Sequence, residues 1–346
     1  SPTMYLVMYF LTLGIYFIGA YLIRDAGMAD KIGIFGNMVV FSSYAMQVIM
    51  SFLMLAMIFM MLPRAQVSAN RINEVLDTEI TVKDGTIDNN TNNEVGTVEF
   101  KNVGFKYPDG EDYVLKDISF KANKGETVAF IGSTGSGKST LINLVPRFYD
   151  ATEGEILVDG VNVKDYKLTS LYNKIGYVAQ KAVIFNDTVS GNVSYGDNGK
   201  GEISREKVKE AIEVAQGKDF VEKMENSYDT QMAQGGSNVS GGQKQRISIA
   251  RAIARNPEIY IFDDSFSALD YKTDSILRKE LKKYTKDATT LIVAQRIGTI
   301  MNADKILVLD EGNLVGMGTH KELLESCEVY KQIALSQLSK EELDNA

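Results

Sequence analysis

Two long stretches without a charged residue constrain this chain more than any other feature of its sequence. The first runs from Met4 to Ile23 and the second from Ile32 to Leu62. Each is longer than the roughly 18 apolar residues that a helix needs to cross a bilayer core of about 30 Å. A signal peptide would begin with basic residues, and a buried soluble helix rarely stays uncharged for so long. The sequence therefore predicts a membrane hairpin, with a short charged loop over residues 24–31.

The second helix is expected to leave the membrane and continue past Pro63 through the segment RAQVSANRINEVLD. Arg64 and Arg71 follow its apolar part, as is typical of a cytoplasmic end. We assign residues 1–77 to the C-terminal part of a transmembrane domain, 78–96 to a polar linker and 97–346 to a soluble domain. Two helices alone cannot enclose a route through a bilayer. We therefore expect the sequence to be the C-terminal part of a longer chain.

The soluble part has the pattern of an α/β domain with a largely parallel sheet. Five β-rich runs, TVAFI, KIGYVA, IYIF, TTLIVA and KILVLD, alternate with helix-like segments. The net charge of −8 over 346 residues argues against a nucleic-acid partner. Cys327 is the single cysteine, which excludes an internal disulfide and suits a cytosolic domain.

The most specific motif is GSTGSGKS, which lies between the run TVAFI and the helix-like STLINLV. It fills the pattern G-x-x-x-x-G-K-[ST], whose glycines let backbone N–H groups surround phosphate oxygens. The lysine supplies a positive charge and the serine hydroxyl is a ligand for Mg²⁺. The motif predicts a nucleoside triphosphate site. Its residues, with the next one, are Gly132, Ser133, Thr134, Gly135, Ser136, Gly137, Lys138, Ser139 and Thr140.

A second motif is the run IYIFDD, which ends in Asp263 and Asp264. An apolar strand that ends in a carboxylate, downstream of a phosphate loop, is where such enzymes hold Mg²⁺. Asp263 takes this role together with Ser139. An isolated pair of carboxylates after a strand would more simply be a turn or a helix cap, but the phosphate loop favours the metal.

A third motif, VSGGQKQRISIARAIARNP, places small residues at the start of a helical segment, where free N–H groups favour an anion. The three motifs together resemble those of ATP-binding cassette (ABC) proteins. The resemblance covers essentially the whole chain. It implies α-helical transmembrane segments followed by an α/β P-loop NTPase domain of the ABC type, as in an exporter half-transporter. The signature residues are Ser240, Gly241, Gly242 and Gln243.

Further roles come from this resemblance alone. Tyr107 matches the aromatic residue that stacks on adenine, with a buried structural tyrosine as the alternative. Gln180 matches a glutamine that contacts Mg²⁺ and faces the membrane domain. SALD, residues 267–270, matches a loop that crosses to a partner subunit. In such proteins two domains enclose two ATP molecules, each between one chain's phosphate loop and the other chain's signature. The implied cofactors are ATP and Mg²⁺.

Two residues depart from the family pattern at hydrolytic positions. Asp264 stands where exporters usually have Glu, and Gln295 replaces the switch histidine. A carboxylate displaced by about 1 Å can lower a rate on the order of a hundredfold, and an amide cannot carry the proton of an imidazole. Gln234 and Val239 are milder departures. The single histidine, His320, is expected to be a surface or helix-start residue.

The sequence thus predicts one subunit of a heterodimeric, bacterial-type ABC exporter in the cell membrane, with its nucleotide-binding domain in the cytoplasm. This chain would bind ATP at a degenerate site, where Asp264 and Gln295 would catalyse hydrolysis only weakly. It would supply its signature to the partner's site. A homodimeric exporter with slow ATPase activity, or a nucleotide-gated channel or sensor, is the alternative. The Met-rich and Phe-rich helices are consistent with lipid, drug or peptide substrates, and more simply with lipid-facing or helix-packing surfaces.

Overall fold

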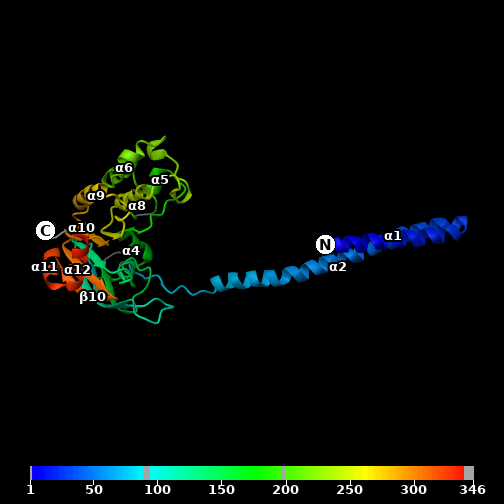
Figure 1. Ribbon diagram of the computed structural model, residues 1–346, viewed down its shortest axis with the longest axis horizontal. Coiled ribbons are helices and arrows are strands. Elements are labelled where there is room, and N and C mark those ends of the chain that lie inside the picture. Colours follow the sequence, from blue (N-terminus) through cyan, green and yellow to red (C-terminus); the bar gives the residue numbers. More distant parts are fainter. Residues whose placement is uncertain (1, 89–93, 197–198, 339–346) are drawn as a thin grey trace. The chain divides into compact units, whose positions relative to one another are not determined.

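The computed structural model describes residues 2–88, 94–196 and 199–338. It divides the chain into two compact units, residues 1–80 and 81–346 (Figure 1). Each unit is described by itself.

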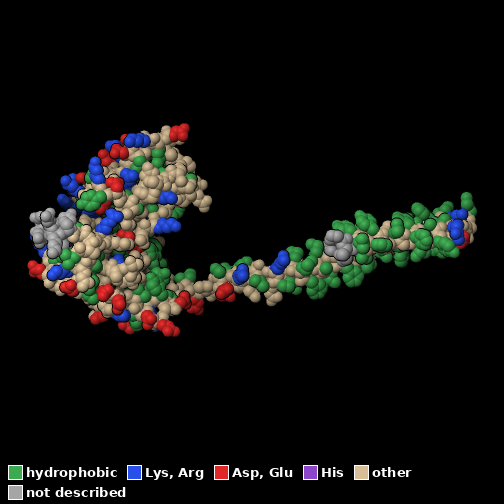
Figure 2. All heavy atoms as spheres, viewed as in Figure 1, with side chains coloured by type: hydrophobic (Ala, Val, Ile, Leu, Met, Phe, Trp, Pro, Cys, Tyr) green, Lys and Arg blue, Asp and Glu red, His purple; other side chains and the backbone are tan. Residues whose placement is uncertain are grey.

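The first unit is a hairpin of two helices, α1 (Pro2–Asp25) and α2 (Met28–Leu76). Both are long and apolar enough to cross a membrane, and hydrophobic side chains cover most of α1 and the adjoining length of α2 (Figure 2). As predicted, α2 continues through Pro63. The helices pack closely at Gly19, where a Cβ atom would lie 1.9 Å from the Met38 sulfur.

The prediction of a charged loop over residues 24–31 was wrong in its length. Only Ala26 and Gly27 separate the two helices. The charged residues instead occupy the helix ends, where Arg24 lies in the last turn of α1 and Asp30 in the first turn of α2. Opposite charges at these two ends are stabilised by the helix dipoles.

The second unit contains a six-stranded sheet with the strand order β10-β9-β3-β8-β7-β6. The five predicted β-rich runs form its parallel strands, so this part of the fold prediction is confirmed. Strand β10 pairs with β9 in the antiparallel direction. The strands are β3 (Thr127–Gly132), β6 (Ile175–Val178), β7 (Ile259–Asp263), β8 (Thr289–Val293), β9 (Lys305–Asp310) and β10 (Asn313–Gly318).

A four-stranded antiparallel sheet, with the order β2-β1-β4-β5, packs against the phosphate-loop side of the unit through a shared hydrophobic core. The sequence analysis did not identify these strands. Their apolar residues alternate with charged ones, as in Val98, Glu99, Phe100 and Lys101. The strands are β1 (Val98–Phe105), β2 (Leu115–Ala122), β4 (Glu153–Val158) and β5 (Val161–Asn162).

The rest of the regular structure in this unit is helical. They are α3 (Lys138–Asn143), α4 (Leu168–Lys174), α5 (Val189–Val193), α6 (Arg205–Val214), α7 (Lys218–Val221), α8 (Gly241–Arg255), α9 (Tyr271–Tyr284), α10 (Ile297–Ile300), α11 (His320–Ser326) and α12 (Glu328–Gln337), with short 3₁₀ turns at Ser227–Asp229 and Gln234–Gly236.

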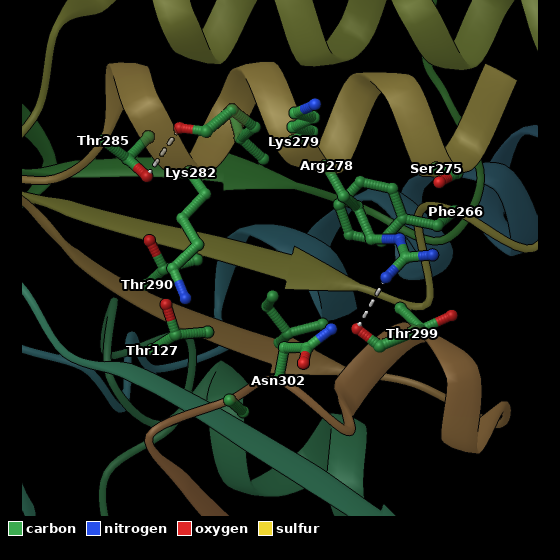
Figure 3. Close-up of a pocket in the computed structure, with 13 residues that line it drawn as sticks. Thr127, Phe266, Ser275, Arg278, Lys279, Lys282, Thr285, Thr290, Thr299 and Asn302 are labelled. Atoms are coloured by element: carbon green, nitrogen blue, oxygen red, sulfur yellow. Dashed lines mark hydrogen bonds between the residues drawn. The ribbon is translucent and has the colours of Figure 1, made fainter. Parts of the chain in front are cut away.

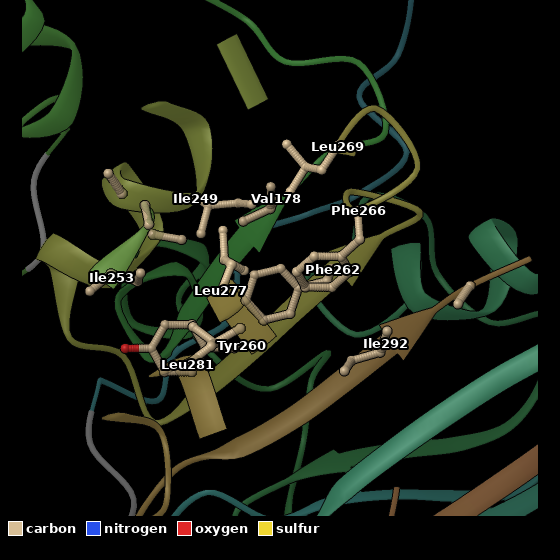
Figure 4. Packing of buried hydrophobic residues seen from close by; sticks show 14 of the residues in the cluster. Val178, Ile249, Ile253, Tyr260, Phe262, Phe266, Leu269, Leu277, Leu281 and Ile292 are labelled. Atoms are coloured by element: carbon tan, nitrogen blue, oxygen red, sulfur yellow. The ribbon is translucent and has the colours of Figure 1, made fainter. Parts of the chain in front are cut away.

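Strand β7 runs through the main core and fixes the position of the carboxylates that follow it. Every residue of β7 is buried. Figure 4 shows Tyr260 and Phe262 packed among side chains that include Leu277 and Leu281 of α9. Because protein cores are close-packed, the end of β7 has little freedom to move.

Part of the predicted linker is bound to the α/β unit. The Asp84 carboxylate accepts a hydrogen bond from the Leu168 N–H at 2.7 Å, at the start of α4. Ile87 forms an isolated parallel bridge with Tyr166. Residues 89–93 of the predicted linker lie outside the described residues.

Candidate nucleotide-binding site

The loop between β3 and α3 has a backbone that requires glycine. Gly135 and Gly137 have positive φ angles of 84° and 95°, and a Cβ atom on Gly132 would lie 2.0 Å from the Leu309 carbonyl oxygen. Side chains are strongly disfavoured in both situations. The GSTGSGKS motif therefore folds into a glycine-dependent turn directly before the first turn of α3, the arrangement that suits phosphate oxygens.

Lys138 is folded into this loop. Its ammonium donates hydrogen bonds to the carbonyl oxygens of Gly132, at 3.0 Å, and Ser133, at 2.7 Å. Burial lowers the pKa of Lys138, against the opposing effect of the Asp264 and Asp263 charges. The side chain is held where it can exchange these carbonyls for phosphate oxygens.

The pair expected to bind Mg²⁺ is formed. Ser139 Oγ donates a hydrogen bond of 2.8 Å to Asp263 Oδ1. Burial raises the pKa of Asp263, and the Ser139 bond opposes that rise. Mg²⁺ takes oxygen ligands and is usually held by one or two protein groups plus substrate phosphates. The Ser139 and Asp263 oxygens therefore fit an ion that arrives with its nucleotide. The described residues contain no group of three or more His, Cys, Asp or Glu side chains that could hold a metal ion.

The two departures from the family pattern contact each other. Gln295 Nε2 donates a hydrogen bond of 2.8 Å to Asp264 Oδ2, and Gln180 Nε2 donates a second one of 3.2 Å to the same oxygen. Asp264 also has a positive φ of 46°. Burial raises the pKa of Asp264, and the charge of Asp263 raises it further. One oxygen of the Asp264 carboxylate thus accepts hydrogen bonds from both side-chain amides. In this structure the Gln180 side chain therefore contacts Asp264.

Tyr107 lies beside the phosphate loop. Its hydroxyl is 3.0 Å from Thr140 Oγ1, in the first turn of α3. Its ring packs edge-on against Phe105 and Tyr149, with centroid distances of 4.9 and 5.2 Å. The ring is half-buried and bonded to α3, and its contact with a nucleotide base stays a prediction.

Tyr177, which lies inside β6, is a further residue of the site that no motif in the sequence indicated. Its hydroxyl donates a hydrogen bond of 2.8 Å to Asn143 Oδ1 and is 3.5 Å from Asp263 Oδ2. Burial raises the pKa of Tyr177, so the phenol keeps its proton. The only signal available in the sequence was the position of this tyrosine three residues before Gln180.

The signature residues occupy the start of α8, apart from the phosphate loop. Ser240 caps the helix, and its side chain and that of Gln243 bond to each other's backbone N–H. A Cβ atom on Gly241 would meet no atom within 4 Å, whereas one on Gly242 would lie 3.2 Å from the Ala268 carbonyl oxygen. The N-terminus of α8 is therefore open at Gly241.

Of the two alternatives expected for His320, a surface or a helix-start residue, the structure has the second. His320 begins α11, as predicted, but it is buried rather than on the surface. The next helix, α12, brings Tyr330 against it, with the hydroxyl 2.6 Å from His320 Nδ1. The sequence does not show that α12 covers this side chain, because that contact forms only in the folded structure.

The site combines a glycine loop that holds a lysine with an aspartate at the end of a strand, and this aspartate is bonded to the loop serine. These features are those of a P-loop nucleotide-binding domain. Residues 115–267 match the family model described as ABC transporter. This part of the chain is similar to ABC transporters, whose nucleotide-binding domain binds ATP with Mg²⁺.

Relatives with known names support the same family. An uncharacterized ABC transporter ATP-binding protein of Mycobacterium tuberculosis is 44% identical over 305 residues, which cover 87% of this chain and 52% of that protein. An uncharacterized ABC transporter ATP-binding protein of Bacillus subtilis is 40% identical and covers 98% of this chain and 57% of its own length. A putative multidrug export ATP-binding/permease protein of Staphylococcus aureus is 44% identical over 75% of this chain and 44% of its own length.

A solved structure of a bacterial Atm1-family ABC exporter with ATP bound is also similar. It has a TM-score of 0.72 and 34% sequence identity, over 88% of this chain and 53% of the exporter chain. The present chain spans about half the length of the curated relatives it matches. Its two apolar helices fit insertion into a membrane, with the nucleotide-binding domain in the cytoplasm.

Proposed function

We propose that this chain is part of one subunit of a heterodimeric ABC exporter, and that its own ATP site is weakly hydrolytic. The site binds MgATP through the phosphate loop, Asp263 and Tyr107, while Ser240, Gly241, Gly242 and Gln243 complete the partner's site. Similarity to an Atm1-family exporter and to a putative multidrug export protein supports export. Drug-like apolar compounds are therefore the first substrates to assay.

The contact between Gln295 and Asp264 is the observation that best supports the proposal of weak hydrolysis. A general base must lie within hydrogen-bond reach of the attacking water. Asp264 is one methylene shorter than Glu, and its Oδ2 already accepts two amide hydrogen bonds. Gln295 is itself held by this bond and cannot exchange a proton as histidine does. Both features lower the reactivity of water at this site.

Nucleotide binding is supported by a separate set of contacts. The Ser139 to Asp263 hydrogen bond and the carbonyl bonds of Lys138 are formed independently of Gln295. When bound, MgATP supplies the phosphate charges that these residues neutralise. Such a site would hold nucleotide as a clamp between the subunits while the partner's site turns over.

Two alternatives share these contacts. In a homodimeric exporter both sites would carry Asp264 and Gln295, and turnover would be slow throughout. A nucleotide-gated channel or sensor would use the same bound ATP to open a passive path. Transport against a substrate gradient distinguishes an exporter from a channel, and the identity of the chain that co-purifies distinguishes the two kinds of dimer.

The proposed weak site is tested with the chain made to pair with itself. We expect ATP to bind with Mg²⁺, and to be hydrolysed at least about a hundredfold more slowly than by the native pair. Equilibrium binding of labelled ATP and phosphate release are measured on the same preparation. Lys138→Ala serves as the control that removes binding. Rapid hydrolysis by a verified self-pair would overturn the proposal.

A further inference from the structure

A cavity of about 480 Å³ lies between α9 and the segment that follows α10. Figure 3 shows its lining, which comes from the first residues of β3 and β8 as well as from these helices. None of the residues assigned to the nucleotide or to the signature lines it. The cavity belongs to a different part of the α/β unit from the phosphate loop.

Four polar side chains that line the cavity have no side-chain partner. Within the described ranges, no side-chain hydrogen bond or ion pair is formed by Lys282, Thr127, Thr290 or Asn302. They come from four separate segments, and Figure 3 shows Lys282 extending from α9 toward the two threonines. Thr290 is almost fully buried. Lys282 and Asn302 are exposed and Thr127 is half-buried, so these groups are accessible to a polar ligand that enters the cavity.

The charge of the cavity is positive. Arg278 is neutralised by a two-point bond with Asp274, with both distances 3.0 Å. Lys282 has no carboxylate partner among the residues that the structure describes. The neighbouring Asp304 is occupied by the Thr127 N–H, at 2.8 Å. Figure 2 shows Lys and Arg side chains gathered over the region of α9, in a chain of net charge −8.

Part of the remaining lining is apolar, and the other part, which includes Ser275 and Lys279, is polar or charged. Phe266, Leu281 and Ile292 are buried and contribute to the cavity wall. A volume of about 480 Å³ lies within the range of small-molecule sites, and these three side chains give the cavity an apolar wall beside its polar groups. The ligand should therefore carry an apolar body as well as a charged group.

We propose that this cavity is a second ligand site, which binds a small organic anion with an apolar body. The charged group is a carboxylate or a phosphate monoester. The Lys282 ammonium pairs with it, the Thr127 and Thr290 hydroxyls donate hydrogen bonds to it, and the Asn302 amide orients the ligand. The site goes beyond the proposed export function and does not depend on which nucleotide site hydrolyses ATP.

Titration calorimetry of the full chain with its partner tests the site, with MgADP present at saturation to fill the phosphate loops. The probes are 2-naphthoate and 2-naphthyl phosphate, which separate a carboxylate site from a phosphate site. We expect saturable binding of at least one probe. Lys282→Gln should weaken it at least about tenfold, because a charged hydrogen-bonding partner is lost. Lys283→Gln, which changes the adjacent lysine that does not line the cavity, should leave it unchanged.

Two further comparisons separate a built site from general attraction to a basic surface. Thr290→Val keeps the shape of the side chain and removes one donor, and should weaken binding severalfold. The uncharged 2-naphthamide should bind at least about tenfold more weakly than the carboxylate. The proposal is overturned if neither anion binds, if the amide binds equally well, or if Lys282→Gln and Thr290→Val, shown by thermal unfolding to be folded, bind like the native chain.

Discussion

At the scale of single residues, the chemistry of this site depends on one oxygen atom. Asp264 Oδ2 accepts hydrogen bonds from Gln295 and Gln180, so two changes that look separate in the sequence act on the same atom. A glutamate would reach about one methylene farther, and a histidine would be able to exchange a proton. Restoring both residues should therefore restore hydrolysis.

The first prediction is that Asp264→Glu combined with Gln295→His raises ATP hydrolysis by the self-paired chain by about a hundredfold. Each single change should give much less, because a new base still needs a competent switch residue. Phosphate release at saturating MgATP measures the effect. A double variant no faster than the native chain would show that Asp264 and Gln295 do not limit turnover.

The second prediction concerns stability at acid pH. Burial lowers the pKa of His320, so the folded chain binds its proton less readily than the unfolded chain. Stability is therefore unaffected above the ordinary histidine pKa of about 6.5 and falls as the pH drops below it. Between pH 7.5 and pH 5, the Tm of the native chain should decrease more than the Tm of the His320→Gln variant. Equal losses would mean that His320 does not contribute to the acid sensitivity.

At the level of helices and strands, Arg278 connects α9 to α10. One of these helices follows the loop after Asp264 and the other follows Gln295. It binds Asp274 on α9, and its Nη1 donates to the carbonyl oxygens of Gly298, at 2.9 Å, and Thr299, at 3.3 Å, on α10. Helix α9 begins directly after the SALD loop, and α10 begins two residues after Gln295. This tie holds the two segments at a fixed separation.

The third prediction is that Arg278→Met destabilises the α/β unit by about 3 kcal/mol, because the buried Asp274 loses its partner. Lys283→Met, on the same helix, breaks only an exposed pair with Glu280 and should cost less than about 1 kcal/mol. Denaturant unfolding of the two variants gives the comparison. Equal stabilities would show that the tie contributes nothing to folding.

The parallel strands were predictable because each is a short β-rich run followed by helix-like sequence. The antiparallel strands were not identified, since charged residues interrupt them. The motifs predicted Lys138, Ser139 and Asp263 at one site, and their contacts agree with it. The bond between Gln295 and Asp264 was beyond the sequence, because it depends on β7 lying beside β8.

At the scale of the whole molecule, the proposed dimer places the two functions of this chain in different nucleotide sites. The phosphate loop and Asp264 belong to the chain's own site. The start of α8 faces outward at Gly241 and would contact the nucleotide held by the partner. Substitutions at the two places should therefore affect the native pair to different extents.

The most direct test is steady-state ATPase activity and transport by the purified native pair, with substitutions in this chain only. Gly241→Asp adds a negative charge where a Cβ atom meets nothing within 4 Å, so it tests electrostatics rather than packing. Losing one such stabilising donor costs about 3 to 4 kcal/mol in other enzymes, so turnover should fall at least about a hundredfold. Gly241→Asn is the uncharged control and should lose less. Lys138→Ala should slow the cycle only partly. If Lys138→Ala abolishes turnover while Gly241→Asp leaves most of it, the chain's own site is the hydrolytic one and the account is contradicted.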